Sequence, residues 1–171
     1  MMTHPNREEL QNGISALSLD CSEENLVTLL AYIDLLKKWN SAYNLLGGNE
    51  SAALVSRHIL DSLSINPYLD GSLIADIGAG AGLPGVPLAI LNPDKKFVLI
   101  DSNGKKTRFM FQAKIQLGLG NITVENCRIE HYQIALLPDG FELSRSIKLD
   151  VPGSESQRHL IEVMRKKIGK L

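Results

Sequence analysis

Apolar residues in the first third of the chain recur every three or four positions, which is the period of an amphipathic helix with one inward face. The clearest stretch follows Ser22, a suitable N-cap, and the pattern as a whole predicts that residues 6–46 are helical. A second helix is predicted over residues 50–64, where Asn66-Pro67 ends it. The chain therefore begins with a helical region.

After Pro67 the pattern changes to short apolar runs that alternate with helical stretches. This alternation predicts a parallel sheet covered by helices, so the fold class is α/β and Rossmann-like, with an N-terminal helical extension. In the helix expected over residues 103–117 the candidate inward positions are Phe109, Ala113 and Ile115. The expected strands are residues 73–77, 97–100 and 122–125, and the expected helices are residues 84–91 and 103–117.

The C-terminal part of the chain breaks this alternation. Residues 141–148 and 159–164 predict two extended segments, which a Pro- and Gly-containing turn joins into an antiparallel hairpin that closes a sheet edge. We expect two regions, a helical region over residues 1–66 that packs on a core over residues 67–171.

Composition narrows the function classes. With 171 residues, 44% of them hydrophobic and 22% charged, the chain has the profile of a globular domain. The net charge is −1, so the chain lacks the strongly basic character of many nucleic-acid-binding domains. One Trp, four Tyr and four Phe are too few for a sheet covered with base-stacking rings. No apolar run approaches the ~20 residues of a membrane span and no apolar signal segment begins the chain, so we expect a cytoplasmic protein without membrane contact. We also expect a monomer.

Three alternate glycines, Gly78, Gly80 and Gly82, follow the first predicted strand directly. Glycines at this place let the backbone turn with positive φ and let a ligand approach where a Cβ would collide. The next helix begins there, so its unpaired N–H groups face the same space. Taken alone, such a loop is also compatible with a tight connection between a strand and a helix.

Asp101 stands nineteen positions beyond Gly82, at the end of the next apolar run. Nucleoside-binding α/β sheets place a carboxylate there, which accepts hydrogen bonds from the ribose hydroxyls. An acid at a strand end is also compatible with a solvated turn. The glycine loop and the acid together favour a nucleoside site at the carboxyl ends of the strands.

The spacing and charge of the loop discriminate between two nucleoside ligands. Dinucleotide-binding loops have the spacing G-x-G-x-x-G, whereas this loop has G-x-G-x-G and is preceded by Asp76. A carboxylate at this position would repel a pyrophosphate and attract the ammonium and sulfonium groups of S-adenosylmethionine. The loop therefore favours S-adenosylmethionine over a nicotinamide dinucleotide, although Asp76 has an alternative role as the cap of a neighbouring backbone amide.

Several blocks spread over nearly the whole chain follow one family pattern: Lys38-Trp39-Asn40 with Tyr43-Asn44-Leu45, Arg57 to Ser62, Asp76 to Pro87, Leu99 to Ser102 with Gly104-Lys105, and Val151-Pro152 with Arg158-His159-Leu160. In these blocks the chain resembles the RsmG (GidB) methyltransferases, which modify a guanine N7 in small-subunit ribosomal RNA. The resemblance implies an S-adenosylmethionine-dependent methyltransferase fold. It also implies a 16S rRNA (guanine-N7) methyltransferase that acts on small-subunit rRNA or on an assembling small subunit.

The resemblance and the loop analysis together give the expected site, with no catalytic side chain identified and no metal expected. The expected cofactor contacts are Asp76, Gly78, Gly80, Gly82, Leu83, Asp101, Ile129 and Glu130. The expected RNA contacts are Lys105, Lys106, Arg108 and Arg128. The alternatives are a solvated helix face for the first three and a surface ion pair for Arg128.

One part of the family pattern is missing between Gln133 and Ile134. The family continues there with a strand that carries a Ser-Arg-Ala motif, then a helix and a strand, a unit of ~30 residues or more. Either the chain has a true internal deletion, or the protein holds a segment that this sequence omits. A true deletion would leave strand edges with unpaired backbone N–H and C=O groups, which is unfavourable, so we favour the omitted segment. A true deletion keeps an alternative function open, a methyltransferase-like protein that binds S-adenosylmethionine or RNA without catalysis.

Overall fold

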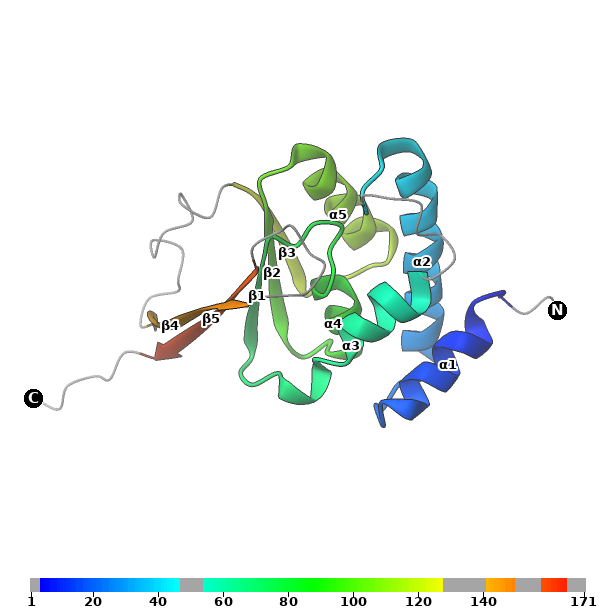
Figure 1. Cartoon of the computed structure of the whole chain (residues 1–171), viewed down its shortest axis with the longest axis horizontal. Coiled ribbons are helices and arrows are strands. Elements are labelled where there is room, and N and C mark those ends of the chain that lie inside the picture. Colours follow the sequence, from blue (N-terminus) through cyan, green and yellow to red (C-terminus); the bar gives the residue numbers. More distant parts are fainter. Residues whose placement is uncertain (1–3, 47–53, 128–140, 150–157, 166–171) are drawn as a thin grey trace, which may run out of the picture.

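The computed structural model describes residues 4–46, 54–127, 141–149 and 158–165 (Figure 1). In chain order the elements are α1 (Arg7–Ala16), α2 (Glu23–Tyr43), the π-helical turn η2 (Val55–Leu60), α3 (Asp61–Leu63), the 3-10 turn η3 (Asn66–Tyr68), β1 (Leu73–Ile77), α4 (Gly85–Leu91), β2 (Lys96–Asp101), α5 (Gly104–Gln116), β3 (Ile122–Asn126), β4 (Phe141–Leu149) and β5 (Arg158–Arg165).

The N-terminal region holds two helices, so the prediction of one helical stretch over residues 6–46 was wrong in its middle. Ser18 has φ 54°, in the left-handed region, and turns the chain between α1 and α2. Ser22 then caps α2 as predicted, because its hydroxyl accepts a hydrogen bond from the Asn25 N–H at 3.1 Å. The predicted helix over residues 50–64 is present from Leu54 to Leu63 as η2 and α3, and its earlier residues lie outside the described part.

The strands β1, β2 and β3 form a parallel sheet in that order. Each lies within two residues of its predicted range, because a short apolar run bounded by turn residues fits a strand better than a helix. The register pairs Ile77 with Ile100 and Asp101 with Asn126. The carboxyl ends of the strands therefore meet at one edge of the sheet, as a site built from loops after strands requires.

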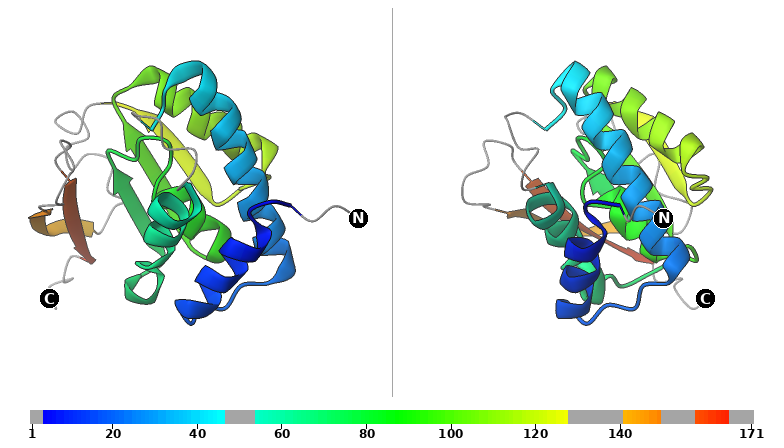
Figure 2. Two further views of the ribbon diagram at one scale, coloured as in Figure 1. Left: turned by 45° about the vertical axis from the view of Figure 1, so that its right-hand side comes forward. Right: turned by 90° about the vertical axis from the view of Figure 1, so that its right-hand side faces the viewer.

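Helices cover one face of this sheet. The α4 and α5 helices pack on the face that carries the fully buried Phe97 and Leu99, and α2 packs against both helices from outside. The opposite face carries the exposed Ala75 and Thr123, and no helix of the described residues covers it. The left view of Figure 2 shows the sheet between the helices and the hairpin. No helix in the described part has both the length and the apolar character that crossing a bilayer requires.

The inward positions of α5 are only partly as predicted. Phe109 and Ala113 are fully buried, but Ile115 is 58% exposed. The reason is the helical period: a residue two positions after Ala113 lies about 200° around the axis, on the outer face of the helix.

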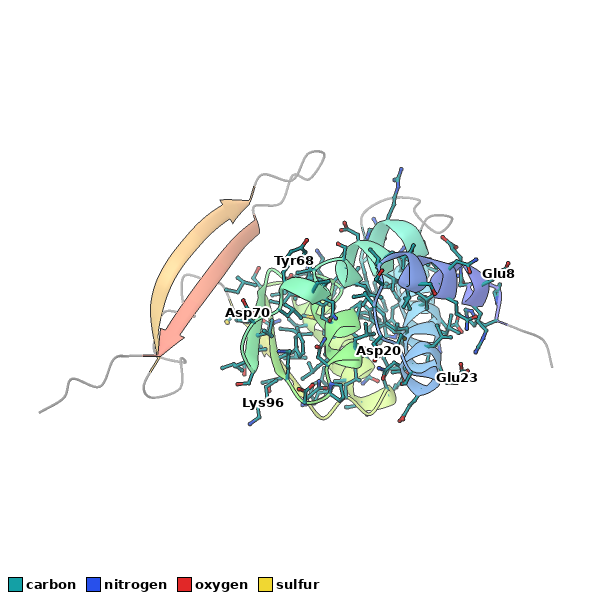
Figure 3. The ribbon with its side chains drawn as sticks, turned by 90° about the horizontal axis from the view of Figure 1, so that it is seen from below. Glu8, Asp20, Glu23, Tyr68, Asp70 and Lys96 are labelled. Atoms are coloured by element: carbon teal, nitrogen blue, oxygen red, sulfur yellow. The ribbon has the colours of Figure 1, made fainter. Side chains whose placement is uncertain are left out.

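The C-terminal hairpin is present, because β4 and β5 pair antiparallel. It forms a two-stranded sheet of its own, so the prediction that it closes the edge of the main sheet was wrong. β5 contacts β1, but Figure 1 shows the hairpin strands inclined to β1, which prevents a hydrogen-bonded ladder between them. Figure 3 shows the same hairpin from below, as a pair of strands set apart from the ribbon of the main sheet, where Asp70 and Lys96 are labelled.

Candidate active site

The glycine loop leaves β1 and bends directly toward β2. Its three glycines all have positive φ as predicted, 77° at Gly78, 59° at Gly80 and 82° at Gly82. The N–H groups of Gly78 and Ala79 both donate to the Ile100 carbonyl, at 2.8 and 3.0 Å. Space beside Gly78 is open within the described part of the chain, since a Cβ added there would meet none of its atoms within 4 Å. The loop thus exposes backbone to a ligand at the carboxyl ends of the strands.

Asp101 lies against this loop. One carboxylate oxygen accepts a hydrogen bond from the Gly80 N–H at 2.8 Å, and the other accepts from the Asn103 N–H at 2.7 Å. The carboxylate is half-buried. Two predicted site residues that are 21 positions apart in the chain are therefore in direct contact, and the acid is held in a fixed orientation by backbone amides.

Asp76 takes the capping role that the sequence left open. Its Oδ2 accepts a hydrogen bond from the Gly85 N–H at 2.9 Å, at the first residue of α4. Glycine at position 85 allows this close approach, because an added Cβ would collide with the Leu99 side chain and stand 2.8 Å from Asp76 Oδ2, so these side chains would have to shift. The half-buried carboxylate thereby fastens the far end of the glycine loop to β1.

Tyr32 is a site residue that the sequence did not reveal. It lies on α2 with no exposed surface, and its hydroxyl donates a 2.7 Å hydrogen bond to the Ala81 carbonyl inside the glycine loop. Burial and then the charge of Asp76 raise the pKa of Tyr32 well above its usual value of 10.0, so the hydroxyl stays a neutral donor. A helix of the N-terminal region therefore supports the loop from behind.

The helix α5 begins beside the same loop. Its N-cap is Asn103, whose side chain accepts hydrogen bonds from the backbone N–H groups of Lys105 and Lys106. The Lys106 ammonium group lies beside the loop, since a Cβ added at Gly80 would stand 3.9 Å from its Nζ. Lys105 and Arg108 are exposed. The three predicted RNA contacts on α5 thus separate into one that faces the loop and two that face solvent.

The match to a family model places the chain among known proteins. The model is described as rRNA small subunit methyltransferase G, and it matches residues 25–167. The chain belongs to this family. The resemblance stated from the sequence is thereby confirmed, together with the Rossmann-like methyltransferase fold and its N-terminal helices.

Relatives within this methyltransferase family are similar over almost their full length. The ribosomal RNA small subunit methyltransferase G of Nitrosococcus oceani is 37% identical, over 94% of this chain and 95% of the relative. The protein of the same name from Shewanella amazonensis is 38% identical, over 92% of this chain and 98% of the relative. Coclaurine N-methyltransferase, solved with N-methylheliamine and SAH, covers 75% of this chain and 41% of its own at 18% identity and a TM-score of 0.43.

The alignments with the relatives are longer than the chain itself. They run over 204 positions for the Nitrosococcus protein and 202 for the Shewanella protein, whereas this chain has 171 residues. Members of the methyltransferase family therefore contain positions that have no counterpart here.

Several predicted features lie outside the described residues. They are the cofactor contacts Ile129 and Glu130, the RNA contact Arg128, and the junction between Gln133 and Ile134. The three contacts follow β3, whose Asn126 pairs with Asp101, so the chain leaves the described part at the carboxyl edge of the sheet. Among the described residues, no group of three or more His, Cys, Asp or Glu side chains is arranged to hold a metal ion.

Proposed function

We propose that this chain transfers a methyl group from S-adenosylmethionine to N7 of a guanine in small-subunit ribosomal RNA. Membership of the rRNA small subunit methyltransferase G family supports the substrate class. The single observation that carries the proposal for this chain is the 2.8 Å hydrogen bond between the Gly80 N–H and Asp101 Oδ2. It joins the open glycine loop to a carboxylate at the end of the next strand, which is the pair of features that a nucleoside site needs.

The two carboxylates of this site fit S-adenosylmethionine. A carboxylate has about four lone-pair sites, and two backbone amides occupy two of those on Asp101, so about two remain for the ribose hydroxyls. Asp76 adds a second negative charge at the base of the loop, which favours a ligand with ammonium and sulfonium groups. We propose further cofactor contacts at Leu83, Ile129 and Glu130.

The reaction makes few demands on acid–base groups. Bound S-adenosylmethionine supplies an electrophilic methyl group on a positively charged sulfur. Guanine N7 carries an in-plane lone pair that is not used in Watson–Crick pairing, so it can attack the methyl carbon without first losing a proton, while the methyl–sulfur bond breaks and a neutral thioether leaves. The side chains of this site need only hold donor and acceptor in line, and such positioning supplies as much as ~7–11 kcal/mol in favourable cases.

We propose that the RNA is held by basic side chains next to the loop. Lys105 and Arg108 are exposed on the first turns of α5. There the Lys105 ammonium group can attract a phosphate as a point charge, and the Arg108 guanidinium can donate two hydrogen bonds to one. Arg128 follows β3 and is proposed for the same role. Lys106 faces the glycine loop, so we assign it to the boundary between the methyl donor and the RNA.

We propose that the chain acts as a cytoplasmic monomer. We also propose that the positions absent from this chain belong after Gln133, as one strand-helix-strand unit. The sheet supports this placement: among the described strands β1 pairs with β2 alone, and the sheet face away from α4 and α5 has no described helix over it. The intact mass of the protein isolated from its source separates the two explanations. A mass of 18.8 kDa would support a true deletion, and a mass larger by that of ~30 residues would support an omitted segment.

Two measurements on the purified chain test the function. Calorimetric titration with S-adenosylmethionine reports cofactor binding, and transfer of labelled methyl to unmodified small-subunit RNA, located by nuclease digestion and mass spectrometry, reports the reaction. We expect binding and label on guanine N7. Binding without transfer would support the non-catalytic alternative, label on another atom would overturn the N7 assignment, and absence of cofactor binding would overturn the proposal.

A further inference from the structure

The helix α5 has a solvent face that its role in the core does not explain. Its inner face holds Phe109, Met110 and Ala113, which are fully buried against the sheet and α2. On the outer face Phe111 is 51% exposed and Ile115 is 58% exposed. These two residues are four positions apart and therefore neighbours on the helix surface. Among the residues that the structure describes, the ring contacts of this region involve Phe109 with Tyr32 and Trp39, and Phe111 takes no part in them.

The charges of α5 have one sign. The sequence of the helix, GKKTRFMFQAKIQ, contains four basic residues and no acidic one, in a chain whose net charge is −1. Arg108 is exposed and precedes Phe111 by three positions, so the two side chains share a face. We call Arg108, Phe111 and Ile115 the α5 stripe.

The α5 stripe leads away from the proposed methyl-transfer site. The helix begins three residues after Asp101, whose carboxylate contacts the glycine loop. At 1.5 Å per residue, Phe111 lies ~10 Å and Ile115 ~16 Å along the axis from Gly104. The stripe therefore lies within reach of the units that flank the reacting unit of a bound polymer.

We infer that the α5 stripe binds an unpaired segment of the RNA that flanks the target guanine, with Arg108 on a phosphate and Phe111 stacked on a base. This assignment rests on the proposed function. Exposed aromatic side chains beside cations are the usual means of holding single-stranded nucleic acid, because every base offers a flat apolar face next to a negative phosphate. A second copy of this chain seated on the α5 stripe would have to cover the Arg108 guanidinium, and α5 offers no acidic side chain to neutralise it.

The test compares Phe111→Ala with Tyr68→Ala. Tyr68 is a matched control, because it is an aromatic residue that is 79% exposed on η3, before β1 and away from the carboxyl ends of the strands. Binding of unmodified small-subunit RNA is measured by filter retention, and S-adenosylmethionine binding by calorimetry. Loss of one stacked base predicts RNA binding weaker by about fivefold or more for Phe111→Ala, with unchanged cofactor affinity. Tyr68→Ala leaves both affinities unchanged.

Two further variants separate stacking from charge. Phe111→Trp keeps an aromatic face and retains RNA binding, whereas Arg108→Ala lowers the slope of log affinity against log salt by about 0.7–0.9, the value for one phosphate contact. Unchanged RNA binding by Phe111→Ala overturns the inference, and so does a wild-type dimer that Phe111→Ala converts to a monomer. Failure of the wild type to bind S-adenosylmethionine or to transfer methyl overturns the proposed function instead, and the RNA-binding comparison still decides the role of the α5 stripe.

Discussion

Replacing Tyr32 with phenylalanine isolates the contribution of the helix α2 to the glycine loop. The substitution removes one hydroxyl and keeps the ring, which lies 6.2 Å from the ring of Phe109 between their centroids. The Ala81 carbonyl then loses the donor at 2.7 Å, and Ala81 is only 4% exposed, so water replaces that donor poorly. Leaving a buried acceptor without a partner costs about 1–3 kcal/mol.

This cost divides between the stability of the fold and the order of the loop. For a chain of this size each kcal/mol lowers the melting temperature by about 2–4 °C. A loop that is less well held must be ordered when ligand binds, which reduces affinity. We expect the dissociation constant for S-adenosylmethionine to rise by roughly fivefold, the equivalent of about 1 kcal/mol.

Calorimetric titration and thermal melting of Tyr32→Phe check both effects. Tyr43→Phe is the control, because Tyr43 lies on the same helix but is 49% exposed, and loss of its hydroxyl should change stability by no more than about 0.5 kcal/mol. A lower melting temperature with an unchanged cofactor affinity would refute the argument, since the hydrogen bond would then hold the helix to the core without ordering the loop.

Three other outcomes follow from the same region. Asp101→Ala should weaken S-adenosylmethionine binding by about 1–3 kcal/mol in a titration, whereas Asp94→Ala, at an exposed acid before β2, should leave it unchanged. Gly85→Ala should destabilise the fold by about 1–3 kcal/mol in urea unfolding, because its Cβ collides with Leu99. Because the pKa of Tyr32 is raised in the folded state, its contribution to stability is complete below pH 10.0 and is lost as the pH rises through the folded value, so the alkaline loss of stability should be shallower in Tyr32→Phe.

The parallel sheet and its glycine loop were predictable because local sequence determines them. Short apolar runs ending in glycine or an acid define β1 and β2, and the positive φ at Gly78 is one that few other residues adopt. The contact between Asp101 and the loop followed from sheet geometry, because adjacent parallel strands bring their carboxyl ends together.

The remaining features depend on contacts between distant parts of the chain. Tyr32 looks like any other member of the apolar stripe of α2, and its partner Ala81 is 49 positions away. Asp76 had two chemically reasonable roles, and only the position of the Gly85 N–H shows that it serves as a cap, while its contact with the cofactor stays a prediction. Ile115 was misplaced because α5 carries apolar residues on both faces, so the hydrophobic pattern alone does not identify the buried one.

The cap of α2 has a practical consequence for anyone who trims this protein. The family match begins at residue 25, inside a helix that starts at Glu23 and is capped by the Ser22 hydroxyl. A fragment cut to residues 25–167 would retain Tyr32 but lose that cap, worth about 0.5–2 kcal/mol, along with the whole of α1 and its buried Leu10 and Ile14. The unit that folds therefore extends further toward the N-terminus than the residues that the family model matches.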